Sequence, residues 1–260
     1  RALHPMEPGF FILTILGGGL FPPLFWLWFF LREDTHRESA RFLVSIFAAG
    51  ALVSLPILGL QLGYQEALGA LADTPAVLFV GLAFIEELLK FAAVFSVAHR
   101  DRAFHGPIDA MVVMVVGALG FTTVENLLII GNALTDLGGS SIAGAAETVA
   151  LRAVGATLLH ALTSAIVGYA WARGRIAAMT AGVESGAFAE VSPNHQLTND
   201  FPRPLLRWVL PGIAAATIFH SVFNQLVLAF KDEHFLYPTL FLIGISFLVF
   251  RDFESLKPKG

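Results

Sequence analysis

The chain has 260 residues, of which 56 % are hydrophobic and 14 % are charged. Soluble domains average about 45–50 % apolar and about 25 % charged residues, so this composition excludes an ordinary soluble domain and indicates an integral membrane protein. The net charge of −4 comes without a basic tract, which argues against a nucleic-acid partner, and the absence of Cys excludes disulfides, thiolate ligands and a cysteine nucleophile.

Apolar runs along the chain are long enough to cross a bilayer as helices. Glycines and two prolines interrupt the first run at Gly17–Gly19 and Pro22–Pro23, which predicts a kink or a close helix contact there. That run is too long for a signal-peptide core and is interpreted as a retained span. The pattern predicts an all-α, polytopic membrane helix bundle of about seven transmembrane helices, at about residues 9–31, 42–63, 76–98, 108–134, 148–172, 204–230 and 235–250.

Arginine and lysine gather after the first, third and fifth runs and at the end of the chain, whereas the intervening loops hold almost none. Because cytoplasmic loops are enriched in these residues, we expect the N-terminus outside and the C-terminus in the cytoplasm. The chain is interpreted as a single transmembrane domain, 1–260, with catalytic helices at about 76–230. A cytoplasmic loop is expected at about 174–203, with a short interfacial helix near 175–183. The short loops favour a multi-pass protein of a prokaryotic plasma membrane.

The third run carries three charges, Glu86, Glu87 and Lys90, near its middle. Each charge at bilayer depth costs at least about 2.5–3.5 kcal/mol, so these residues must serve a purpose. On a helix Glu86 and Lys90 share a face and can pair, which would leave Glu87 free to act on water. If Lys90 turns elsewhere, the roles of the two glutamates reverse, and the sequence leaves this open.

Three later runs hold the other intramembrane polar residues: Glu125 and Asn126, then His160, then His220 and Asn224. With a helical rise of about 1.5 Å per residue, Glu86, Glu125, His160 and His220 all lie roughly 14–18 Å below the outer end of their spans. Polar side chains at one level on four helices predict a shared site. Arg152 is nearer the outer surface and is interpreted as a snorkelling or loop-pairing residue.

Glutamate and neutral histidine together suit two kinds of chemistry. A carboxylate can take a proton from water while His or Asn donors stabilise an oxyanion. Alternatively, His and Glu can bind a divalent metal, most commonly zinc, which lowers the pKa of bound water. The sequence contains neither His-Glu-x-x-His nor Gly-x-Ser-x-Gly, so the common zinc-protease and serine-hydrolase signatures are absent.

Four short motifs follow one another on separate runs: Glu86-Glu87-x-x-Lys90, Phe121 through Glu125-Asn126, His160, and His220 through Asn224. In this order they resemble the PrsW family of intramembrane proteases, which is related to the CAAX-prenyl endopeptidases and bacteriocin-processing proteins. The resemblance implies hydrolysis of peptide bonds in membrane-anchored proteins, with an anti-sigma factor as one possible kind of substrate.

Carried over by position, the resemblance implies Glu86 or Glu87 as the general base and His220 with Asn224 as oxyanion donors. The second motif ends in Glu125-Asn126, where the CAAX branch has a histidine. This departure favours a metal site of Glu87, Glu125, His160 and His220, with zinc as the expected metal and with Lys90 and Asn126 in supporting roles.

Two other functions compete with an intramembrane endopeptidase. Buried Glu, His and Lys residues also mark proton- or ion-coupled transporters, although the chain has no matching halves of the kind that many transporters contain. A non-enzymatic membrane partner that keeps the same fold is the second alternative, and the intact motifs argue against it.

Overall fold

The computed structural model describes residues 16–33, 38–99, 106–136, 155–184, 203–230 and 236–257, together with residues 9, 101 and 104. Within these ranges the regular structure is helical throughout. The helices correspond one to one with the seven apolar runs: α2 (Phe21–Phe30), α3 (Ala40–Leu68), α4 (Pro75–Ala98), α5 (Pro107–Asp136), α7 (Thr157–Glu184), α8 (Arg203–Ala229) and α9 (Leu236–Leu256).

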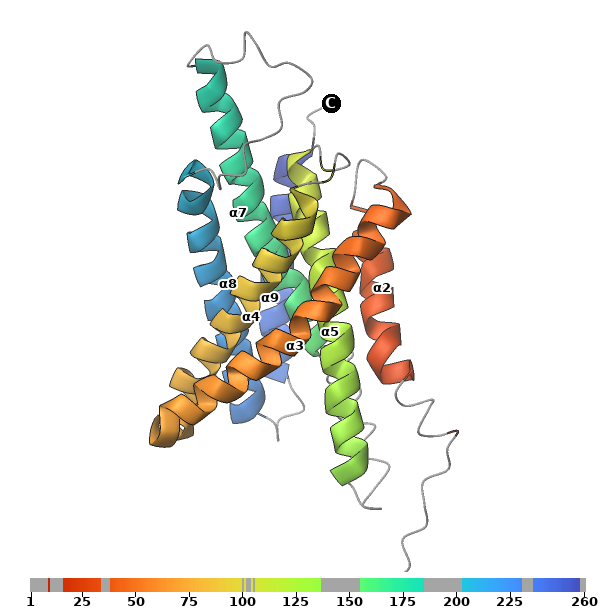
Figure 1. Cartoon of the computed structure of the whole chain (residues 1–260), viewed down its shortest axis with the longest axis vertical. Coiled ribbons are helices and arrows are strands. Elements are labelled where there is room, and N and C mark those ends of the chain that lie inside the picture. Colours follow the sequence, from red (N-terminus) through yellow and green to blue (C-terminus); the bar gives the residue numbers. More distant parts are fainter. Residues whose placement is uncertain are drawn as a thin grey trace, which may run out of the picture.

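Helix α5 is the centre of the bundle, and every residue from Ile108 to Thr123 is buried. It packs against α2, α3, α4 and α7, while α8 closes the side formed by α4 and α7, and α9 lies against α7 and α8. Successive long helices alternate in direction, and the chain ends on the side where α2 ends and α3 begins (Figure 1). On that side Nζ of Lys257 donates a hydrogen bond of 2.9 Å to Oε2 of Glu33, which joins the ends of α9 and α2.

Glycines allow α3 and α5 to cross at very short range. A Cβ atom added at Gly50 would overlap the carbonyl oxygen of Gly117, and one at Gly120 would overlap the carbonyl oxygen of Phe47. Small residues at crossings let helix backbones approach closely, which is a common way of packing helices in membranes.

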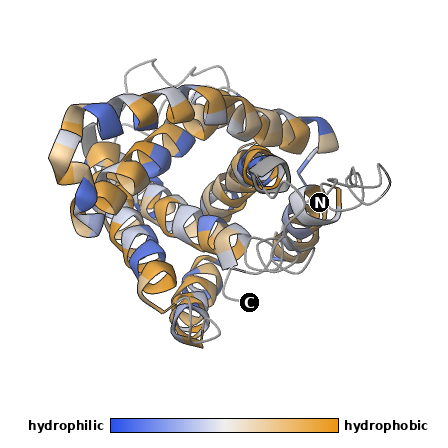
Figure 2. Ribbon diagram, turned by 90° about the horizontal axis from the view of Figure 1, so that it is seen from below, coloured by the Kyte–Doolittle hydropathy of each residue, from blue (hydrophilic) through white to orange (hydrophobic). Residues whose placement is uncertain are grey.

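Among the helices in the described part of the chain, four (α3, α5, α8 and α9) are long and apolar enough to cross a membrane. Large apolar side chains cover the outside of the bundle, and Leu52 of α3, for example, is 68 % exposed. Figure 2 shows hydrophobic residues along the outer helices rather than in the interior alone. Helix α4 is 24 residues long but carries the three charges, all of them buried.

In the first run, the structure describes Gly9 and the residues from Leu16 onward. There Leu16–Leu20 form a π-helical turn, and helix α2 follows from Phe21. Pro22 and Pro23 therefore lie in the first turn of a helix, where proline is tolerated because the first N–H groups have no helical partner. The predicted close helix contact is present, because Gly19 lies against the Leu127 side chain of α5.

The fifth helix differs from the prediction. Helix α7 continues to Glu184, so the interfacial helix expected near 175–183 is an extension of α7 and the loop begins later than residue 174. The segment Arg175–Thr180 continues the helix because it contains no Gly or Pro and includes Ala177, Ala178 and Met179, residues of high helix propensity. Residues 185–202 and Arg152 lie outside the described residues.

Candidate active site

Polar side chains from α4, α5, α7 and α8 meet inside the bundle, as their common depth predicted. Glu86, Glu87 and Lys90 come from α4, Glu125 from α5, His160 from α7 and His220 from α8. All except Glu125 are buried, and the side chain of Glu125 remains 22 % exposed. The cluster thus has a closed interior with one carboxylate at its edge.

Lys90 turns to Glu87 rather than to Glu86. Its Nζ lies 2.7 Å from Oε1 of Glu87, one helical turn away, and both side chains are fully buried. The same oxygen accepts a hydrogen bond of 3.1 Å from the hydroxyl of Thr163 and lies 2.9 Å from Nδ1 of His220. Glu87 is therefore held by a cation and two further donors. Thr163 belongs to none of the four motifs and follows His160 by one turn of α7.

Glu86 has a different environment. Its Oε1 accepts a hydrogen bond of 2.7 Å from the side-chain amide of Gln61, on α3. Its Oε2 is buried without a hydrogen-bond partner and lies 3.8 Å from Nδ1 of His160 and 3.8 Å from Nε2 of His220. Glu86 is thus the carboxylate that faces both imidazoles. No motif marks Gln61, which lies near the end of an otherwise apolar run that was interpreted as lipid-facing.

The two histidines have matching arrangements. Each points one nitrogen at Oε2 of Glu86 and the other at a second carboxylate: Nε2 of His160 lies 3.0 Å from Glu125, and Nδ1 of His220 lies 2.9 Å from Glu87. Their rings are 4.9 Å apart and nearly perpendicular, at 84°. Histidines that bind metals usually donate their other N–H to a carboxylate in this way, which fixes the tautomer and the orientation of the ring.

The tautomer of His160 follows from its partners. Nζ of Lys90 lies 3.2 Å from Nδ1 of His160, and an ammonium group can only donate. Nδ1 therefore carries a lone pair, and Nε2–H donates to Glu125. This lone pair is the one that a metal ion would bind, in place of the contact with Lys90.

Glu86, His160 and His220 fit a divalent metal. Their candidate ligand atoms all lie within 4.8 Å of one another, and a tetrahedral zinc site with bonds of about 2.0–2.1 Å needs ligand separations of roughly 3.4 Å. The unpartnered, buried Oε2 of Glu86 is the atom that a cation would satisfy. This group differs from the predicted ligands, because Glu87 and Glu125 contact the far nitrogens of the two rings instead.

The two asparagines lie in different settings. The amide of Asn126 donates a hydrogen bond of 3.1 Å to the hydroxyl of Thr157 and so links α5 to α7, as expected of a supporting residue. Asn224 is partly buried one turn beyond His220 on α8, and no hydrogen bond joins its side chain to another described residue.

Comparison with known families decides the class of this site. Residues 38–250 match the model of the PrsW family intramembrane metalloproteases, over most of the chain. The chain belongs to this family. A metalloprotease of the PrsW family needs ligands for its metal, and the buried Glu/His/His group is compatible with that role.

Similar proteins in bacteria carry the name Protease PrsW. The protein from Geobacillus kaustophilus is 25 % identical over 247 residues, which is 95 % of this chain and 93 % of the relative. The protein from Halalkalibacterium halodurans is 24 % identical over 87 % of this chain and 88 % of its own length. The protein from Bacillus subtilis is 26 % identical over 70 % of this chain and 79 % of its own length. No solved structure matches this chain.

Membership of the PrsW family favours the endopeptidase over the two competing hypotheses. The family description is that of an intramembrane protease, which acts on proteins. The transporter hypothesis depended on the same buried residues and gains no support from this family match. The family description also supports a bound metal, without naming which metal.

Proposed function

We propose that this protein hydrolyses peptide bonds of membrane-anchored proteins at a zinc ion held by Glu86, His160 and His220. The observation that carries the proposal is the unpartnered Oε2 of Glu86, which lies 3.8 Å from a nitrogen of each histidine. Two histidines and one glutamate, with a fourth position for water, are a ligand set of known catalytic zinc sites.

The bound metal would lower the pKa of its water and polarise the scissile carbonyl. Glu87 and Glu125 orient the two imidazoles by accepting their outer N–H groups. Lys90 balances the charge of Glu87, so three carboxylates can lie around one divalent metal site without a large excess of negative charge. In this scheme Glu87 is a positioning residue and Glu86 is the ligand, which reverses the arrangement expected if Lys90 had paired with Glu86.

Proton transfer is assigned to Glu125, and oxyanion stabilisation to Asn224. Glu125 is the most exposed carboxylate of the cluster, so it is the one that both water and substrate can reach. It would accept the proton of the attacking water and pass it to the amine as the C–N bond breaks. Both nitrogens of His220 are engaged within the cluster, whereas the Asn224 amide, one turn away, remains able to donate to the developing oxyanion.

We also propose that residues 1–260 form one transmembrane domain with seven spans, an outer N-terminus and a cytoplasmic C-terminus. The alternating helix directions and the arginine-rich ends of α2, α4, α7 and α9 support this topology. The relatives come from bacteria, which favours a multi-pass protein of the plasma membrane. The proposed substrate is a membrane-anchored protein such as an anti-sigma factor.

The test measures metal content and cleavage together. We expect near-stoichiometric zinc in detergent-purified wild type, and loss of both zinc and cleavage of a membrane-anchored reporter in Glu86→Gln, His160→Ala and His220→Ala. His99→Ala is the matched control, because His99 lies at the end of α4 and stacks on Phe95 outside the cluster. Full zinc occupancy in all three site variants would overturn the ligand assignment.

A further inference from the structure

Helix α3 carries none of the four motifs, yet one of its side chains reaches the site. Gln61 is partly buried, while its neighbours Leu60 and Leu62 are 53 % and 59 % exposed. Gln61 therefore points into the bundle from a helix whose adjacent residues face outward. Its Nε2 lies 2.7 Å from Oε1 of Glu86.

We propose that Gln61 is a positioning residue for the metal site, which acts by fixing the rotation of the Glu86 carboxylate. This inference rests on the proposed role of Glu86 as a ligand. The two oxygens of Glu86 have separate partners: Oε1 accepts the Gln61 amide proton, and Oε2 is left facing His160 and His220. Without the amide, the carboxylate could rotate about its last torsion, which has a broad energy profile in glutamate.

The chemical nature of the donor matters as much as its position. Glu87 is paired with the Lys90 ammonium, so its charge is largely compensated. The partner of Glu86 on its other oxygen is a neutral amide, which donates a hydrogen bond without cancelling the carboxylate charge and cannot itself compete with the cation. Of the two adjacent glutamates, one is thus paired with a cation and the other has an oxygen left available for a metal.

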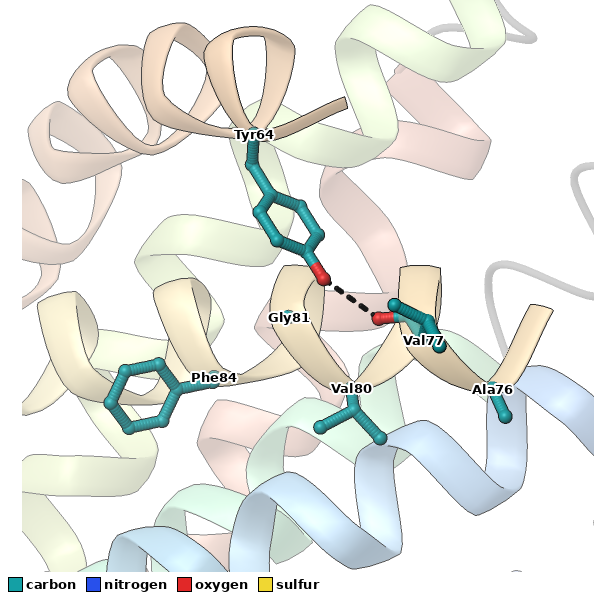
Figure 3. Close-up of a pocket in the computed structure, with 6 residues that line it drawn as sticks. All are labelled: Tyr64, Ala76, Val77, Val80, Gly81 and Phe84. Atoms are coloured by element: carbon teal, nitrogen blue, oxygen red, sulfur yellow. Dashed lines mark hydrogen bonds between the residues drawn. The ribbon is translucent and has the colours of Figure 1, made fainter. Parts of the chain in front are cut away.

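Helices α3 and α4 also contact each other away from Gln61 and Glu86. One turn further along α3, the ring of Tyr64 packs directly on Gly81 of α4, where an added Cβ would overlap it. The Tyr64 hydroxyl donates a hydrogen bond of 2.8 Å to the carbonyl oxygen of Val77 (Figure 3). A shallow apolar pocket of about 510 Å³ lies along the same stretch. This contact lies in the same helix pair as Gln61 but does not touch Glu86.

The experiment measures zinc affinity by competition with a chromogenic chelator, using full-length protein in detergent. Gln61→Met keeps the length of the side chain and removes the donor, and Tyr64→Phe is the matched control because it removes one α3–α4 hydrogen bond away from the site. We expect Gln61→Met to weaken zinc binding by about 10–100-fold, the usual effect of removing an outer partner of a ligand. Tyr64→Phe should leave the zinc affinity within about 2-fold of wild type.

A double variant separates positioning from general loosening. If Gln61 acts through Glu86, adding Gln61→Met to Glu86→Gln should cost no further zinc affinity, because the carboxylate to be positioned is gone. Additive losses in the double variant, wild-type affinity in Gln61→Met, or an equal loss in Tyr64→Phe would each overturn the proposal. If Glu86→Gln alone binds zinc normally, it is the ligand assignment itself that fails, so the two failures are distinguishable.

Discussion

The buried ion pair between Glu87 and Lys90 provides the most direct test of the electrostatics of the site. The perturbation is Lys90→Met, which removes the charge while keeping an unbranched apolar side chain. The Nζ–Oε1 distance is 2.7 Å and neither side chain is exposed, so the carboxylate would remain buried without its cation. Thr163 and His220 would still donate to it.

Two costs set the expected loss of stability: that of leaving Glu87 buried without its cation, and that of protonating it. At 2.7 Å the Coulomb attraction between unit charges is about 6 kcal/mol at an effective dielectric constant of about 20, before the cost of desolvation is subtracted. Removing one partner of a buried pair typically costs about 3–5 kcal/mol. Glu87 can instead take up a proton, which costs about 4 kcal/mol at pH 7 and caps the loss. We therefore expect Lys90→Met to lower the free energy of unfolding by about 3–4 kcal/mol at pH 7.

The assay is equilibrium unfolding by SDS in mixed micelles, followed by tryptophan fluorescence, for Lys90→Met and for the double variant Lys90→Met, Glu87→Gln. The double variant should be the more stable of the two at pH 7, because it leaves no charge buried. The difference should shrink at pH 5, where protonating a glutamate costs only about 1 kcal/mol. Equal stability of the two variants at pH 7 would refute the ion-pair argument, since it would mean that Glu87 carries no charge.

Three further predictions concern other parts of the chain. Asn224→Ala should lower kcat by about 10²–10³-fold with unchanged zinc content, and an unchanged kcat would remove Asn224 from the oxyanion role. Gly50→Leu should destabilise the fold by at least about 1–3 kcal/mol, because its side chain would overlap the Gly117 carbonyl, whereas the control Gly59→Leu faces open space and should unfold like wild type. Hydrogen bonds to Glu254 and Glu33 raise the pKa of Lys257, so its contribution to the free energy of unfolding is present at pH 7 and is lost as the pH rises through that raised pKa. Because the ion pairs are near the surface, Lys257→Ala should cost at most about 1 kcal/mol at pH 7. A larger loss in the same SDS unfolding assay would contradict this assignment.

Much of the fold could be predicted from the sequence because long apolar runs in a bilayer can only be helices. The run expected at 76–98 is α4, Pro75–Ala98, and the run expected at 108–134 is α5, Pro107–Asp136. The differences between predicted and observed helices lie at the helix ends, because hydropathy does not mark where a helix stops. Helix α7 continues past the apolar part of its sequence to Glu184, because helix formation does not require apolar residues outside a membrane.

The charged residues and histidines of the cluster were predictable, but their pairings and their neutral partners were not. Charged and polar residues buried in apolar helices must find each other, and their depth along each helix can be counted from the sequence. Lys90 is three residues from Glu87 and four from Glu86, and a helix allows an ion pair at either spacing. The side-chain rotamers, which the sequence does not reveal, decide that Lys90 pairs with Glu87. Gln61 escaped notice because a single amide near the end of an apolar run carries no motif.

The sequence by itself determined an all-helical membrane protein with a polar centre. Charges inside apolar helices are too costly to face lipid, so they must meet one another inside the bundle. Only the tertiary structure decided which carboxylate faces both histidines, because that depends on how α3, α7 and α8 surround α4. A helix presents Glu86 and Glu87 about 100° apart, and the neighbours on each side give one glutamate a lysine and the other an amide. Two identical, adjacent side chains thereby acquire different roles.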